Sequence, residues 1–253
     1  METTKLLKIT MSCLLFLSVI VTEAAEIRIA IASNFTDAIK SLSRDFEKKT
    51  GHKTKLIFGS TGRHYAQIKN GAPFDVFFAA DSKRPELLEQ EGLIITGSRF
   101  TYAIGKLVLW SPKADLIDSN TKVLEQQNFN HIAVANHKLA PYGKAAHDVL
   151  TGLNLWEKIK SKAVRGENIA QTFQFVKSGN AELGFVALSQ IKHLGKDQQG
   201  SKWEIPENLY QPIKQQAVLL NNNPTAKSFM DYMKTDDARN IILNSGYGIE
   251  NDQ

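Results

Sequence analysis

The sequence predicts an α/β protein of two lobes, and three observations support this fold class. The first half of the chain alternates apolar strand-like runs with amphipathic helices, the second half repeats the alternation, and 253 residues suffice for two cores. The composition is that of an ordinary soluble globular protein, with 42% hydrophobic and 23% charged residues. The formal net charge of +5 is small and forms no polybasic run, so nucleic acid is not expected as a partner.

The amino-terminal segment has the pattern of a secretory signal peptide. Two lysines precede a mostly apolar run at 9–21, which is too short to span a bilayer. Thr22 and Ala24 supply small residues before a cut ahead of Ala25. We therefore predict that residues 1–24 are removed on export to the periplasm. This segment contains the single cysteine of the chain, so thiol catalysis and disulfides are excluded for the mature protein.

The hydrophobic pattern of the first half of the chain predicts strands that are each followed by a helix. An apolar stripe at helical spacing runs from Phe35 to Phe46, and Gly51 ends this first helix. The βαβαβ alternation implies a parallel sheet. The expected strands cover 26–32, 53–58, 75–80 and 106–110, and the expected helices cover 35–50, 60–70 and 82–91.

The second half follows the same alternation and then returns to the first lobe. We expect strands at 131–135, 183–188 and 211–220, helices at 141–150 and 168–177, helical turns over 224–243, and a polar loop at 195–206. This organisation predicts a first lobe made of residues 25–105 plus 215–253, and a second lobe made of residues 106–214. The two crossovers between the lobes would form a hinge.

Two loops of the first half combine a strand end with a helix start. They contain Ser33-Asn34 and Gly59-Ser60-Thr61-Gly62. The first N–H groups of a helix lack intrahelical acceptors and carry the positive end of the helix dipole, so they can receive an anion without lysine or arginine. In α/β sheets ligands also bind at this edge. The alternative is that these polar side chains only cap their own helices.

Several motifs, in this order and spacing, resemble the periplasmic molybdate-binding proteins of ABC importers, and the match spans nearly the whole mature chain. Each motif is weak alone, whereas the set is specific. They are ASNFTDA (32–38), FGSTG (58–62), NGAPFDVF (70–77), AAD (79–81), LAPYG (139–143), GENIA (166–170) and GFVA (184–187).

The resemblance implies a type II-like periplasmic binding fold, in which each lobe is a mixed sheet flanked by helices and neutral donors hold an oxyanion in the interlobe cleft. Many members place a tyrosine hydroxyl on the anion where this chain has Ala187, so the Asn34 amide and an extra N–H replace that donor, or the affinity is lower. The family's first-lobe hydroxyl positions fall on Asn34 and Thr61, with Ser33 and Ser60 adjacent, and its second-lobe backbone donors fall on Tyr142 and Ile169.

The chemistry of the anion supports such a site independently. Molybdate, tungstate and sulfate are fully deprotonated dianions at neutral pH and need only donors, whereas monohydrogen phosphate calls for a carboxylate acceptor. No acid is among the proposed ligands, and we interpret the nearby Asp37 and Glu167 as first-turn helix acids. Sulfate and molybdate differ mainly in size, and the sequence does not give the cavity radius.

Several other polar residues are assigned no role in binding. The six histidines show no metal-ligand spacing, so molybdenum is expected only within bound molybdate, and no cofactor is needed. The loop around Ser60 lacks the G-x-S-x-G spacing of a hydrolase elbow. Five residues flank the proposed loops and are expected to be solvated: Arg63, His64, Lys138, Lys144 and Arg165.

We thus expect a monomeric, non-enzymatic, extracytoplasmic receptor that captures molybdate, and tungstate as well, closes around it, and delivers it to the membrane permease of an ABC transporter. Two alternatives remain open. One is a receptor for sulfate or a small organic anion. The other is an exported serine hydrolase that uses Ser60.

Overall fold

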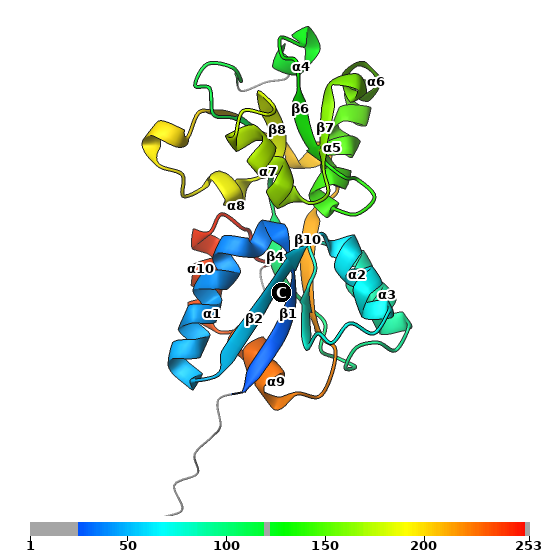
Figure 1. Ribbon diagram of the computed structural model, residues 1–253, viewed down its shortest axis with the longest axis vertical. Helices are drawn as coiled ribbons and strands as arrows, with labels where there is room; N and C mark the ends of the chain where they lie inside the picture. The colour runs from blue at the N-terminus through cyan, green and yellow to red at the C-terminus, as the bar shows by residue number, and fades with distance from the viewer. Residues whose placement is uncertain (1–24, 119–121, 251–253) are drawn as a thin grey trace, which may run out of the picture.

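The structure, a computed structural model, describes residues 25–118 and 122–250. Its strands form two five-stranded sheets, and Figure 1 shows the two lobes that contain them stacked along the longest axis of the molecule. The predicted two-lobed α/β fold with mixed sheets is confirmed. The predicted signal peptide lies outside the described residues. Within the described ranges, no helix is long and apolar enough to cross a membrane.

The sheet of lobe 1 has the strand order β2-β1-β3-β10-β4. Strand β1 is parallel to β2 and β3, whereas β10 is antiparallel to β3 and β4. The parallel sheet expected from the βαβαβ alternation is therefore wrong beyond β1–β3, because β10 enters from the other lobe in the opposite direction. The strands are β1 (Glu26–Ala32), β2 (Lys53–Gly59), β3 (Val76–Phe78), β4 (Phe100–Gly105) and β10 (Ile213–Leu219).

The helices of lobe 1 cover both faces of this sheet (Figure 1). Helix α1 buries the predicted apolar stripe, which includes Ile39, Leu42 and Phe46, in the same core as the isoleucines of β1. It ends at Gly51, whose φ of 75° is the left-handed conformation that glycine adopts without strain. The helices are α1 (Thr36–Thr50), α2 (Thr61–Lys69), α3 (Lys83–Gln90), α9 (Pro224–Tyr232) and α10 (Asp236–Asn244), and a 3₁₀ turn (Ser33–Phe35) precedes α1.

The sheet of lobe 2 has the order β7-β6-β8-β5-β9. Strand β6 is parallel to β7 and β8, and β5 is antiparallel to β8 and β9. The strands are β5 (Leu107–Ser111), β6 (Ile132–Ala135), β7 (Ala163–Gly166), β8 (Leu183–Ala187) and β9 (Ser201–Glu204). The helices are α4 (Lys122–Gln126), α5 (Pro141–Gly152), α6 (Trp156–Ile159), α7 (Ile169–Lys177) and α8 (Leu188–Ile191), with 3₁₀ turns at Lys160–Lys162, Lys196–Gln198 and Glu207–Leu209.

Strand β9 corrects the loop expected at 195–206. Ser201 and Trp203 are buried while Lys202 and Glu204 are exposed, the alternation of a strand with one face on the core. The pattern covers only four residues within a mostly polar segment, so it does not stand out from a loop in the sequence. The indole of Trp203 adds to the core of lobe 2.

The chain crosses between the lobes twice, from β4 to β5 and from β9 to β10. The carboxyl-terminal segment stays with lobe 1, where Gly248 bridges Ile104 of β4. Register places the ends of β1 and β2 together, with Ala32 opposite Gly59, and the ends of β6 and β7 together, with Ala135 opposite Gly166. In each lobe, two strand-to-helix loops therefore lie side by side at the carboxyl ends of parallel strands.

Candidate functional site

The side of the cleft that belongs to lobe 1 carries Ser33, Asn34, Ser60 and Thr61, and all four are buried. Ser60 occupies the N-cap position of α2, yet its side chain makes no capping hydrogen bond. The hydroxyl of Thr61 accepts a hydrogen bond from the backbone N–H of Ala80 at 3.0 Å. Ser33 and Asn34 direct their side chains to other elements. Capping of their own helices therefore does not account for these four residues.

The facing side in lobe 2 is formed by the first turns of α5 and α7. Tyr142 is the second residue of α5, after Pro141, and Ile169 is the first residue of α7; both are buried. The backbone N–H groups at these positions have no intrahelical acceptor and carry the positive end of the helix dipole. Asn168 caps α7, because its Oδ1 accepts from the N–H of Gln171 at 3.0 Å.

Direct contacts join the two sides of the cleft. The Ser33 hydroxyl donates to Oδ1 of Asn168 at 3.1 Å and accepts from the N–H of Ala170 at 3.3 Å. The N–H of Gly62 donates to the carbonyl oxygen of Leu139 at 2.9 Å. A Cβ at Gly62 would lie 3.1 Å from Leu139 Cα, so glycine permits this approach. The six sequence-predicted residues thus lie on four loops that meet, and the lobes are closed on each other.

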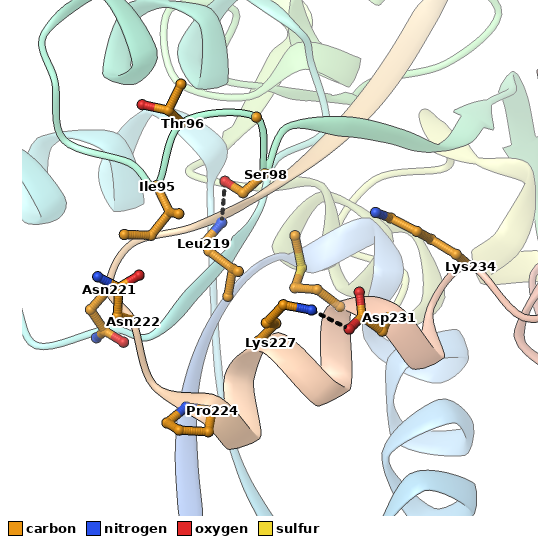
Figure 2. A pocket seen from close by; sticks show the side chains of 12 residues that line it. Ile95, Thr96, Ser98, Leu219, Asn221, Asn222, Pro224, Lys227, Asp231 and Lys234 are labelled. Carbon is orange, nitrogen blue, oxygen red and sulfur yellow. Dashed lines mark hydrogen bonds and ion pairs between the residues drawn. The ribbon is translucent and has the colours of Figure 1, made fainter.

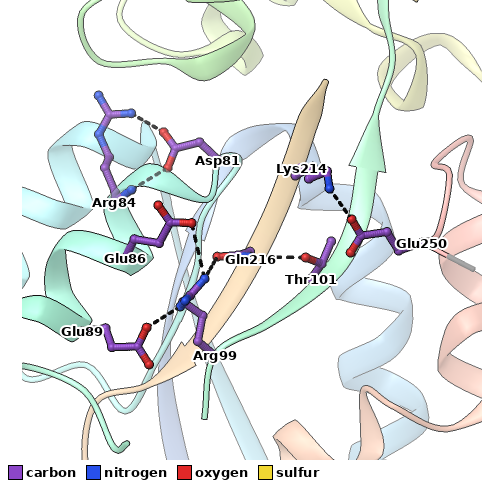
Figure 3. Close-up of polar contacts among 9 residues, drawn as sticks. All are labelled: Asp81, Arg84, Glu86, Glu89, Arg99, Thr101, Lys214, Gln216 and Glu250. Atoms are coloured by element: carbon purple, nitrogen blue, oxygen red, sulfur yellow. Dashed lines mark hydrogen bonds and ion pairs between the residues drawn. The ribbon is translucent and has the colours of Figure 1, made fainter. Parts of the chain in front are cut away.

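A further contact across the mouth of the cleft comes from Arg84 of α3. Its guanidinium forms an ion pair with Asp81 of the same lobe, as Figure 3 shows, and its Nη2 donates to the carbonyl oxygen of Lys138 in lobe 2 at 2.8 Å. The sequence does not reveal this contact of Arg84, because nothing in the preceding AAD motif indicates a partner in the other lobe.

A buried polar network supports Asn34 from behind. Its Nδ2 donates to Oε1 of Gln215 at 2.8 Å and to the hydroxyl of Tyr247 at 3.1 Å, while its Oδ1 is buried without a partner. The Tyr102 hydroxyl also reaches Gln215 Oε1, at 2.9 Å, and Gln215 Nε2 donates to the Tyr142 hydroxyl at 3.2 Å. Burial raises the pKa of all three tyrosines, so their hydroxyls stay protonated.

Among the described residues, no lysine, arginine, aspartate or glutamate is buried. Asp37 is exposed in the first turn of α1, as expected. Glu167 is also exposed, but it precedes the N-cap of α7, so its assignment to the first turn of a helix was wrong. Binding at this site would therefore rely on neutral donors.

Of the five flanking residues expected to be solvated, His64 is the exception. Its side chain is buried, and Nε2 lies 3.2 Å from the carbonyl oxygen of Ile31. Burial lowers the pKa of His64, which keeps the ring neutral. Its Nδ1 faces Gln67 at 3.1 Å, so both nitrogens are engaged away from Ser60. Arg63, Lys138, Lys144 and Arg165 are exposed, as expected.

The described part of the chain shows no metal-binding cluster, and one cavity outside the cleft lies within a single lobe. In the described ranges, no cluster of three or more His, Cys, Asp or Glu side chains could hold a metal ion. A cavity of about 450 Å³ lies in lobe 1 between residues 95–98 and α9, and Figure 2 shows the ion pair of Lys227 and Asp231 in its wall. Because lobe 1 alone lines this cavity, lobe closure would not respond to a ligand in it.

Comparison with known proteins agrees with the fold. The chain belongs to the bacterial extracellular solute-binding protein family, whose model matches residues 27–248. It is 52% identical over 231 residues to a molybdate-binding protein, ModA, of Azotobacter vinelandii, covering 90% of this chain and 92% of that protein. It is 44% identical to ModA of Rhodobacter capsulatus over 230 residues, with 90% of each chain covered.

A solved structure shows the same architecture. The Azotobacter vinelandii periplasmic molybdate-binding protein superposes with a TM-score of 0.86 and 44% identity, covering 89% of this chain and all of that chain. The resemblance that the sequence motifs indicated is therefore confirmed.

Proposed function

We propose that this protein captures molybdate, and tungstate as well, and delivers it to the membrane permease of an ABC transporter. The observation that carries the proposal is the meeting of four strand-to-helix loops, two from each lobe, around buried neutral donors. The relatives named as molybdate-binding proteins support the identity of the anion. The proposed ligands are the side chains or N–H groups of Ser33, Asn34, Ser60 and Thr61 and the backbone N–H groups of Tyr142 and Ile169.

Neutral donors suit a fully deprotonated tetrahedral dianion. Helix starts offer N–H groups that are already aligned with the helix dipole. The positive end of this dipole is stabilised by a negative charge placed there. A dianion of this kind requires no acceptor from the protein, and the exposed carboxylates of Asp37 and Glu167 supply none. Since the donors come from both lobes, only the closed form satisfies all the oxygens of the anion.

The cellular setting follows from the same proposal. Residues 1–24 direct the chain to the periplasm, where it acts as a monomer, and a permease recognises the closed form. The protein makes and breaks no bond and uses no cofactor. Molybdenum is present only within the bound anion.

The position of the family tyrosine is filled by Ala187, which is fully buried at the end of β8. No side-chain donor is available at that position. We propose that the Asn34 amide replaces it, because Asn34 is buried and follows Ser33, which bonds the first turn of α7. The backbone carbonyl oxygen of Asn34 is fixed by the Ser189 and Tyr247 hydroxyls, at 3.2 and 2.7 Å.

Isothermal titration calorimetry with molybdate, tungstate, sulfate and phosphate tests the proposal. We expect binding of molybdate and tungstate, weaker binding of sulfate and no binding of phosphate. Tighter binding of sulfate than of molybdate would contradict the substrate and leave the fold untouched. Turnover of an ester that is lost in Ser60→Ala would instead show a hydrolase.

A further inference from the structure

The side-chain amide of Asn34 has one position without a partner. Nδ2 is held by Gln215 and Tyr247, whereas Oδ1 is buried with no hydrogen bond. The atom at the Oδ1 position is therefore the one atom of this amide that is left to contact a ligand. An oxygen there offers an acceptor, which repels a deprotonated oxyanion, whereas a nitrogen there would offer a donor.

A half-turn of the Asn34 amide exchanges these two atoms without moving the rest of the side chain. Nδ2 would then face the ligand, and Oδ1 would face Gln215 and the Tyr247 hydroxyl. That hydroxyl would donate to Oδ1 instead of to the backbone carbonyl oxygen of Asn34, which Ser189 still bonds. The contact with Gln215 stays favourable only if the Gln215 amide turns as well, so that its Nε2 donates to Asn34 Oδ1 and its Oε1 accepts from the Tyr142 hydroxyl. The Tyr102 hydroxyl fits both arrangements, because it can donate to the carbonyl oxygen of Ala79, which lies 3.1 Å away.

We infer that Gln215 is a positioning residue that sets the orientation of the Asn34 amide, and that oxyanion binding selects the arrangement in which Asn34 Nδ2 points at the anion. Gln215 does not touch the ligand in this scheme. It makes a neutral amide at position 34 a donor instead of an acceptor, and in this way determines affinity for a fully deprotonated anion. The inference rests on the proposed function and goes beyond it.

Closure and amide orientation are linked through Tyr142. Gln215 lies on β10 in lobe 1, and Tyr142 lies on α5 in lobe 2, with the two side chains 3.2 Å apart. The Tyr142 hydroxyl therefore anchors Gln215 only when the lobes are closed. The space for this contact is narrow, because a Cβ at Gly105 would lie 2.2 Å from the Tyr142 hydroxyl oxygen and 2.7 Å from Gln215 Nε2.

The test is the molybdate affinity of Gln215→Met and Tyr142→Phe, measured by calorimetry on the mature protein. Methionine keeps the size of glutamine and removes both hydrogen-bonding atoms, and phenylalanine removes one oxygen while the Tyr142 backbone N–H stays. We expect about tenfold weaker binding for Gln215→Met and about threefold for Tyr142→Phe. The double variant should bind no more weakly than Gln215→Met, because both changes act through one contact.

Two matched controls separate positioning from a general loss of stability. Gln216→Met makes the same change one residue along β10, where the side chain bonds Arg99 and Thr101 instead (Figure 3). Tyr232→Phe removes a hydroxyl that donates to Asp45, away from the cleft. Both controls should bind molybdate with unchanged affinity.

A spectroscopic readout distinguishes orientation from occupancy. In ¹H–¹⁵N spectra at saturating molybdate, the Asn34 side-chain NH₂ signals should shift in the wild type and shift less in Gln215→Met. Unchanged affinity and an unchanged shift in Gln215→Met would overturn the inference while the proposed function stands. Should Gln215→Met fail to fold, additive effects of Tyr142→Phe and Asn34→Ala would overturn it equally. A wild-type protein that binds neither molybdate nor tungstate would overturn both proposals.

Discussion

At the scale of single residues, the hydroxyl of Thr61 is the donor whose role can be isolated most cleanly. It is fully buried and already accepts a hydrogen bond from the N–H of Ala80, so its proton remains to be donated to the anion. We predict that Thr61→Ala weakens molybdate binding by about 1–3 kcal/mol, because a donor to a charged, desolvated group is lost. Calorimetry measures the change directly.

Thr61→Ser is the control for this prediction, since it keeps the hydroxyl and removes only a methyl group. It should retain most of the affinity. Equal affinities of the wild type and Thr61→Ala would exclude Thr61 from contact with the anion.

The sequence identified residues at helix starts because local pattern is sufficient there: a strand, a short polar loop and a helix follow each other within a few residues. It did not identify the partners of Asn34, since Gln215 is 181 residues away and Tyr247 is 213 residues away in the chain. Gln215 is the middle one of three consecutive polar residues in β10, so the local pattern gives no sign that its side chain is buried. Its burial depends on which element faces it. The prediction that His64 is solvated was wrong for the same reason, because its burial depends on the elements that pack against it.

At the scale of elements, the start of α5 is fixed against the end of β6 by close packing at Gly143. A Cβ there would lie 2.3 Å from the carbonyl oxygen of Ala135, a backbone atom that cannot yield easily. We predict that Gly143→Ala displaces the first turn of α5, lowers the free energy of unfolding by about 1–3 kcal/mol and weakens molybdate binding, because the Tyr142 N–H moves with the helix. Chemical denaturation and calorimetry measure the two effects.

Gly152→Ala provides the control on the same helix. Gly152 is the last residue of α5, and a Cβ there meets nothing within 4 Å. This variant should be as stable as the wild type or slightly more stable, since alanine favours the helix. A Gly143→Ala protein that behaves like Gly152→Ala would contradict the packing argument.

The long elements were predictable and the short edge elements were not. Helix α1 and strands β1 and β2 have strong periodicity and clear terminators, and their observed bounds agree closely with those expected. Strands β4, β7 and β9 lie at the edges of the sheets, and each has six residues or fewer. Their residues are half-buried, or they alternate between buried and exposed over too few residues to be recognised in the sequence. Pairing with a neighbouring strand defines them as strands.

At the scale of the whole molecule, both sheets follow one plan. In each sheet the first strand of a βαβ unit lies between its parallel partners, and an antiparallel strand that enters from a crossover lies fourth in the order. Local sequence pattern cannot reveal that β10 inserts between β3 and β4, since this depends on the path of the chain through lobe 2. The same path ties the lobes together by two crossovers, the geometry that hinge closure requires.

The stability of the closed form should depend on Arg84, because its bond to the Lys138 carbonyl exists only when the lobes meet. The Arg84 side chain is 19% exposed and is held in place by Asp81, so little conformational freedom is lost on closure.

Since the bond between Arg84 and Lys138 forms after the anion has entered, its loss should act on release of the anion. We predict that Arg84→Ala raises the dissociation rate of molybdate about threefold to tenfold and changes the association rate little. Stopped-flow displacement of bound molybdate by excess tungstate measures the dissociation rate, and mixing of the free protein with increasing molybdate measures the association rate. Arg99→Ala removes the same charge from lobe 1, where its partners Glu86, Glu89 and Gln216 all lie, and it should leave release unchanged. Equal acceleration in the two variants would mean that overall charge, and not the bond across the cleft, controls opening.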